Sequence, residues 1–213
     1  MDEIGAVEEV PESLWRRIRE RPDRTPEHIA IAAAEHFAGP AERWAALTRA
    51  HHEPAAAARI ARRKHVWLSR VEGAALGVGG AITAVPDAVA LTWIQGRMVF
   101  YIAAAYGFDP RHRMRPAELL ALQGIYPTAV EAREALDGIG RHMALQYVDS
   151  KTEQQRRPGR LALMAGRYAA KRATLRLVPL LASPLNAVAN ARATAALGNR
   201  ALRYYGGEAQ ARP

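Results

Sequence analysis

The fold of this chain is decided by residues 73–110, GAALGVGGAITAVPDAVALTWIQGRMVFYIAAAYGFDP. The stretch is too apolar for a surface segment, but Asp87 and Arg97 interrupt it. Each of its uncharged runs is shorter than the roughly 20 residues that one helix needs to cross a bilayer. A charge at the bilayer centre would cost about 2.5–3.5 kcal/mol. We therefore expect helices that are buried in protein or that lie at a membrane surface.

Small residues recur at helical spacing in this stretch and again near the end of the chain. The predicted ridges are Gly73, Gly77 and Ala81 in the first segment, and Ala187, Ala191 and Ala195, with Gly198 continuing near them, in the second. Such ridges allow helices to approach one another closely. We expect the two small-faced helices to pack together.

Helix-forming segments separated by proline or glycine run along the rest of the chain, and no alternating strand pattern appears. The expected helices cover residues 26–37, 41–52, 55–72, 87–106, 116–123, 128–147, 160–177 and 185–205. Gly39 and Pro40 should separate the first two helices, and Gly107 should end the helix before it. The prediction is an all-α protein with one multi-helix domain.

The two ends of the chain differ in composition from this domain. Residues 1 to about 25, with Pro11, Pro22 and the adjoining Pro26 among charges, are predicted to form a mobile or loosely docked arm. The expected organisation is an N-terminal extension over residues 1–54, a helical domain over 55–206 and a tail over 207–213. No signal peptide is evident, and the absence of cysteine excludes disulfides and thiolate metal sites. A cytoplasmic protein is the expectation.

Positive charge is concentrated in the last third of the chain. Residues 1–137 hold 17 Arg and Lys against 18 Asp and Glu, whereas residues 138–213 hold 13 against 3. The residues expected to contact an anionic surface are Arg160, Arg167, Lys171, Arg172 and Arg176. An acidic lipid surface and nucleic acid both fit, the latter with Tyr204 and Tyr205 as stacking candidates, and a solvated arginine-rich face is the alternative.

Polar residues lie inside both apolar segments. They are Asp87, Gln95 and Arg97 in the first, and Asn186, Asn190 and Arg192 in the second. Buried together, they would form a hydrogen-bonded network or line a small polar pocket, with Asp87 also suited to a helix cap. His51 and His52 are adjacent and point to different faces, so no metal site is predicted. Neither a cofactor nor a catalytic motif is expected.

The chain resembles the EcsC family of bacterial proteins over roughly residues 55–206. The resemblance is carried by GVGGAITAVPD, the following LTWIQGRMVFYIAAAYGFDP and the late RLVPLLASPLNAVANARATAALGNRALRYY, in that order. It implies an all-helical, membrane-associated domain and supplies no activity. The family takes its name from an operon that also encodes ABC transporter components.

Three functional hypotheses follow from the sequence. The first is a non-enzymatic protein at the inner face of the cell membrane, accessory or regulatory to a membrane transporter, with anionic lipid or a membrane protein as partner. The second is a nucleic-acid-binding helical module that uses the basic last third. The third is a protein that handles a lipid or small molecule in a buried polar pocket.

Overall fold

The computed structural model describes Ile4 and residues 8–76, 84–146 and 179–210. These residues form helices and no strand, which confirms the all-α prediction. The elements are α1 (Glu12–Glu20), the short 3-10 helix η1 (Pro22–Arg24), α2 (Thr25–Arg49), α3 (Pro54–Leu76), α4 (Ala84–Ala105), α5 (Arg115–Leu122), α6 (Ala129–Gln146) and α8 (Pro179–Gln210).

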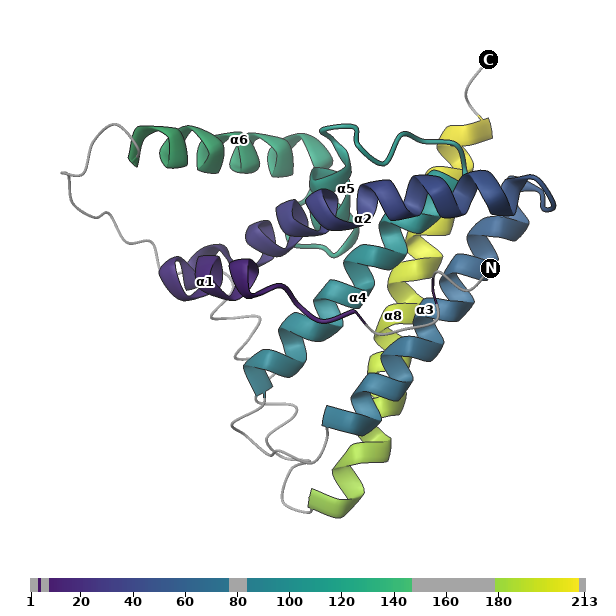
Figure 1. The fold of residues 1–213 in the computed structure, drawn as a ribbon, viewed down its shortest axis with the longest axis horizontal. Helices are drawn as coiled ribbons and strands as arrows, with labels where there is room; N and C mark the ends of the chain where they lie inside the picture. Colours follow the sequence, from purple (N-terminus) through teal and green to yellow (C-terminus); the bar gives the residue numbers. More distant parts are fainter. Residues whose placement is uncertain (1–3, 5–7, 77–83, 147–178, 211–213) are drawn as a thin grey trace.

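Helix α4, from the decisive stretch, lies at the centre of the bundle (Figure 1). It packs against α2, α3 and α8, and every residue from Met98 to Ala105 is buried. The segment Pro86–Ala105 is long and apolar enough to cross a membrane, with a mean hydropathy of 1.3, but 78% of it is buried inside the molecule. The sequence left open whether this helix is buried in protein or lies at a membrane surface, and in the structure α4 is buried in protein.

Helices α3 and α8 run antiparallel, side by side, along one flank of α4 (Figure 1). Alanines form the inner face of α3, where Ala57, Ala58 and Ala61 are buried. On α8, Ala187, Ala191 and Gly198 are buried, whereas Ala195 of the same small-residue ridge is half-buried. A Cβ built on Gly198 would lie 2.8 Å from Cγ of Arg62 and 3.1 Å from Sδ of Met98. This glycine therefore sets how closely α8 approaches α3 and α4.

The first ridge is described only in part. Gly73 belongs to α3, and its surroundings lie outside the described residues, as do Gly77 and Ala81. Asp87 lies in the first turn of α4, which is one of the positions the sequence favours. At the other end of α4, Gly107 adopts a φ of 83°, and the amide of Phe108 donates to the Ala103 carbonyl at 3.1 Å. This left-handed glycine ends the helix as predicted.

Helix α2 differs from the prediction of two helices separated at Gly39 and Pro40, because it continues through both residues. An interior proline costs about 3 kcal/mol. The compensation is a single buried stripe on both sides of the proline, made by Ile29, Ala33, Phe37, Ala41 and Trp44. Burying large side chains such as Phe37 and Trp44 contributes about 1.5–3 kcal/mol or more each, which outweighs the lost backbone bond.

The N-terminal segment is also more closely packed than the expected arm. Leu14 and Ile18 of α1 are buried, and Ile4 is 1% exposed. All three belong to the hydrophobic core that also contains the buried side chains of α4. Leu14 and Ile18 are four residues apart, so they lie on one apolar edge of α1. The prolines and charges around this edge hide it in the sequence. Other predicted helices recur as α3, α5, α6 and α8 with shifted ends, whereas residues 160–177 lie outside the described residues.

Candidate functional site

The predicted polar network is divided between two sides of α4. Gln95 faces α8, where its Nε2 donates to the hydroxyl of Thr194 at 3.4 Å, the long limit of a hydrogen bond. Asn190, one turn away on α8, is 4% exposed. Asp87 is buried and has an interaction partner, Arg192 is exposed, and the surroundings of the Asn186 side chain lie outside the description.

Arg97 points to the opposite side of α4 from Gln95, because two residues on a helix are about 200° apart. It is 2% exposed, and its Nη2 lies 3.1 Å from Oε1 of Glu8. The rings of Phe37 and Tyr101 lie 5.8 and 5.4 Å from its guanidinium carbon. The carboxylate thus comes from the N-terminal segment. Nothing in the local sequence around Arg97 could have identified this partner.

A second buried charged cluster joins α8 to α5, and no sequence pattern predicted it. Arg115 forms an ion pair with Glu118, whose Oε2 also accepts a 2.7 Å hydrogen bond from the Tyr205 hydroxyl. Burial, reinforced by the Glu118 charge, raises the pKa of Tyr205 well above its usual value. The Arg115 guanidinium lies 5.1 Å from the Phe108 ring. These closed contacts stabilise the fold and leave no room for a ligand.

His65 is the most deeply buried histidine in the described structure. Its Nδ1 lies 2.8 Å from the Ala61 carbonyl oxygen, and its ring packs 5.3 Å from that of Tyr101. Burial lowers its pKa from 6.5 to about 3, so the imidazole is neutral at physiological pH. The residue is a core histidine between α3 and α4.

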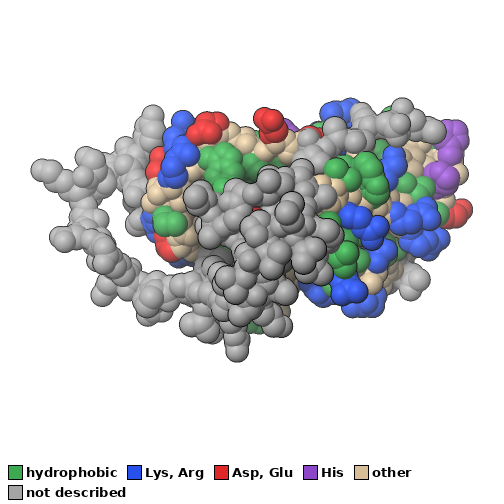
Figure 2. Space-filling model, turned by 90° about the horizontal axis from the view of Figure 1, so that it is seen from below, with side chains coloured by type: hydrophobic (Ala, Val, Ile, Leu, Met, Phe, Trp, Pro, Cys, Tyr) green, Lys and Arg blue, Asp and Glu red, His purple; other side chains and the backbone are tan. Residues whose placement is uncertain are grey.

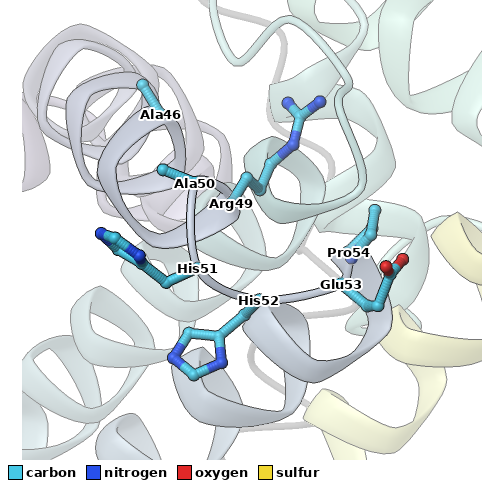
Figure 3. Close-up of a pocket in the computed structure, with 7 residues that line it drawn as sticks. All are labelled: Ala46, Arg49, Ala50, His51, His52, Glu53 and Pro54. Carbon is cyan, nitrogen blue, oxygen red and sulfur yellow. The ribbon is translucent and has the colours of Figure 1, made fainter.

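The clearest hollow is a shallow depression of about 690 Å³ at the α2–α3 junction. Figure 3 shows His51 and His52 there with side chains pointing away from each other, as their adjacency predicts. The remaining lining residues are Ala46, Arg49, Ala50, Glu53 and Pro54. Within the described residues, no group of three His, Cys, Asp or Glu side chains could hold a metal ion. The open shape and diverging side chains do not form a ligand site.

The outer surface of α3 and α8 has a different character, and we call it the α3–α8 face. Its exposed members are Arg59, Arg63, Trp67, Arg70 and Val71 on α3, and Val188, Arg192, Arg203 and Tyr204 on α8. On α3 they recur every three or four residues, opposite the buried Ala57, Ala61 and Leu68. Figure 2 shows Lys and Arg side chains gathered with hydrophobic ones between them on this side of the molecule.

Acidic residues are few on α3 and α8, where Glu72 and Glu208 near the helix ends are the only Asp or Glu residues of the sequence. Residues 54–71 and 179–207 contain neither Asp nor Glu. Several arginines elsewhere pair with carboxylates, for example Arg19 with Glu12 at 2.7 Å and Arg17 with Glu35 at 3.3 Å. The arginines of the α3–α8 face form no salt bridge within the described residues. The five residues expected to form the anionic contact (Arg160, Arg167, Lys171, Arg172 and Arg176) lie outside them.

The EcsC protein family model matches residues 45–206. The chain belongs to this family. The EcsC region begins ten residues earlier than the resemblance indicated, at the end of α2, and it includes the whole α3–α8 face and Arg97. Glu8, Phe37 and α1 lie before it. No curated protein and no solved structure matches the chain significantly.

Proposed function

We propose that this EcsC family protein is a non-enzymatic peripheral membrane protein that binds anionic lipid surfaces reversibly through the α3–α8 face. The observation that carries the proposal is a two-helix surface with five exposed arginines that form no salt bridge within the described residues. They are Arg59, Arg63, Arg70, Arg192 and Arg203. The inner face of the cell membrane, which presents anionic lipid, is the proposed location. A transporter component in that membrane is a further proposed partner and rests on the family resemblance.

The binding free energy can be estimated from the electrostatic attraction between the arginines and anionic lipid. Each basic residue close to an anionic bilayer contributes about 1 kcal/mol, and the contribution falls off within a Debye length of about 8–10 Å at physiological salt. Two helices lying side by side hold their arginines on a fixed surface, so several can reach one membrane plane together. Such binding is reversible and sensitive to salt.

The two alternative functions have less support. A nucleic-acid site would use aromatic stacking among the cations. Of the candidates in the basic last third, Tyr205 is fully buried and bonded to Glu118, Tyr204 is 38% exposed, and Tyr168 lies outside the described residues. A site for a lipid or small molecule would use the predicted polar pocket, but Gln95 and Arg97 face opposite sides of α4. Surface binding to lipid therefore explains more of the described structure.

The test is vesicle co-sedimentation with a charge-matched pair of variants. One variant replaces Arg59, Arg63 and Arg192 by Gln. The control replaces Arg16, Arg43 and Arg113, which are exposed on α1, α2 and the α4–α5 connection. Both lose three positive charges, so net charge alone cannot separate them. Duplex and single-stranded nucleic acid are tested in parallel by gel shift.

We expect the parent to sediment with anionic vesicles, to bind neutral vesicles far less, and to release from anionic vesicles as salt rises. The face variant should lose up to about 3 kcal/mol, roughly a hundredfold in partitioning, while the control stays near the parent. Equal losses in both variants would leave only net charge as the cause and refute a specific face. Tight nucleic-acid binding without vesicle association would favour the second function.

A further inference from the structure

We infer that the place where α3 and α8 touch carries a binding site for a phosphate group, formed by Arg59 and Arg62 of α3 and Asn199 of α8. Arg63 and Arg203 flank these three residues. The inference deepens the proposed function and rests on it for the source of the phosphate, which is the headgroup of an anionic lipid. It adds one defined position on the α3–α8 face at which a phosphomonoester is preferred.

The contact between the two helices determines which residues surround the site. A Cβ built on Gly198 would lie 2.8 Å from Cγ and 3.2 Å from Cδ of Arg62, so the stem of this arginine crosses α8 at the glycine. Arg59 is one turn before Arg62 and lies about 60° round α3 from it. Asn199 is the residue of α8 that follows Gly198, and it is exposed like Arg59.

Arg59 and Asn199 lie on either side of this contact at nearly the same height. The helices are antiparallel (Figure 1), so three residues back along α3 and one residue forward along α8 lead in the same direction. At 1.5 Å per residue, the two positions differ by about 3 Å along the helix axes. The buried faces of both helices are turned toward α4, and both exposed side chains therefore emerge on the side away from it.

Arg62 supplies a donor that the described residues leave without an acceptor. Its Nε is buried and has no hydrogen-bond partner. The side chain as a whole is half-buried, so its guanidinium end is open to solvent between the two helices. A buried donor without a partner is unfavourable, and an anion bound at the surface would give the guanidinium group the acceptor that it lacks.

The charges around the site identify the chemical class of its ligand. Every ion pair among the described residues involves other cations than Arg59, Arg62 and Arg63. A phosphomonoester carries about two negative charges at neutral pH and three acceptor oxygens, so it can accept from several guanidinium groups and a carboxamide together. Arginine is suited to this role because its planar fork of donors matches phosphate. A carboxylate or a phosphodiester, with one negative charge, would balance less of the cluster.

An NMR titration of the full chain with glycerol 3-phosphate, a soluble phosphomonoester, tests the site. The Nε–Hε signal of Arg62, assigned by its loss in Arg62→Lys, should shift as the ligand is added and give the dissociation constant. Arg62→Lys keeps a long stem and the charge but loses the fork of donors, so backbone signals around Gly198 should show weaker binding in it. An Nε–Hε signal that does not move would overturn the site.

Two double variants with the same loss of charge locate the binding. Arg59→Gln with Arg63→Gln removes two cations of the site and should weaken binding of glycerol 3-phosphate on the order of thirtyfold. Arg70→Gln with Arg192→Gln removes two cations of the same face, about 9–12 Å along the helices from the Gly198 contact, and should change binding by less than about threefold because that distance is near a Debye length. All four side chains are exposed, so both variants should fold like the parent.

Asn199→Asp tests the contribution of α8 by placing a carboxylate inside the site. The new carboxylate should pair with the neighbouring arginines, raise the melting temperature and abolish binding of glycerol 3-phosphate. Arg70→Gln lowers the net charge by the same single unit and should do neither. Undiminished binding in Asn199→Asp would exclude α8 from the site and overturn the two-helix arrangement.

Vesicles distinguish a lipid headgroup from a soluble phosphate as the ligand. At equal surface charge, we expect the parent to bind phosphatidic acid, a phosphomonoester lipid, about fivefold better than phosphatidylglycerol, a phosphodiester. Equal binding of the two lipids, or equal weakening in the two double variants, would overturn the site and leave reversible surface binding standing. Binding of glycerol 3-phosphate without any vesicle association would refute the proposed function and assign the site to a soluble phosphomonoester. Tighter binding of a short oligonucleotide than of either vesicle would assign it to nucleic acid and overturn the lipid source.

Discussion

Among the described glycines, Gly198 leaves the least room for an added Cβ, and replacing this residue by alanine should destabilise the protein. The added Cβ would lie 2.8 Å from Cγ of Arg62 and 3.1 Å from Sδ of Met98, both below an ordinary van der Waals contact. Cγ is close to the backbone of α3, and Met98 is fully buried, so neither atom can move aside alone. Overpacking of this kind costs about 1–3 kcal/mol.

A control separates packing from helix propensity, because alanine is favoured over glycine in a helix by about 1 kcal/mol. Gly138 lies in α6 with nothing within 4 Å of a built Cβ, so Gly138→Ala gains the propensity without the clash. The difference between the two variants in free energy of unfolding therefore equals the packing cost of about 1–3 kcal/mol. For a chain of this size each kcal/mol shifts the melting temperature by about 2–4 °C.

Urea unfolding and thermal melting of both variants give the measurement. We expect Gly138→Ala to be as stable as the parent or more stable, and Gly198→Ala to fall below Gly138→Ala by the stated amount. Equal stabilities for the two variants would refute the reasoning.

Two further predictions concern buried polar groups. Tyr205→Phe should lower the free energy of unfolding by about 1.5–3 kcal/mol in a urea titration, because the Glu118 carboxylate loses a buried donor, whereas half-exposed Tyr204→Phe should change it by less than about 0.5 kcal/mol. The lowered pKa of His65 means that the unfolded chain binds this proton first as pH falls below about 6.5, so stability is lost toward acid by up to about 1.4 kcal/mol per pH unit. His65→Gln should flatten the dependence of the free energy of unfolding on pH between about pH 6.5 and 5. His28, whose pKa is also lowered by burial, should contribute a smaller loss of stability toward acid. A pH dependence that is unchanged in His65→Gln would contradict a neutral buried His65.

The positions of most helices could be predicted because local signals and tertiary packing agree. Gly107 ends α4 since only glycine adopts its left-handed conformation without strain, and that requirement is visible in the sequence. Pro40 predicted a break between two helices, whereas α2 continues through it. Its local cost is real, but the buried stripe through Phe37 and Trp44 outweighs it, and such a stripe stabilises a helix only once α4 is in place to cover it.

The composition of the polar network could be predicted but its partners could not. Asp87, Arg97 and Asn190 are buried, as polar residues within apolar helices indicate. Which atoms these side chains contact depends on the side of the helix that they face. Gln95 and Arg97 are only two residues apart, yet Gln95 faces α8 and Arg97 faces Glu8. Arg97 belongs to the EcsC region while Glu8 precedes it, so this chain supplies the carboxylate of a buried family arginine from outside the family segment.

The basic face was hidden from the sequence for a related reason. Counted by segment, the charges of α3 belong to the nearly neutral first two thirds of the chain. The acids that neutralise that count pair with other arginines in the structure, as Glu35 does with Arg17 and Glu42 with Arg111. The cations of α3 are left beside those of α8 by the antiparallel packing of two helices more than a hundred residues apart in the chain. A net charge locates an excess of cations along the chain, but a membrane or any other anionic partner responds to the charge that remains on one surface after pairing.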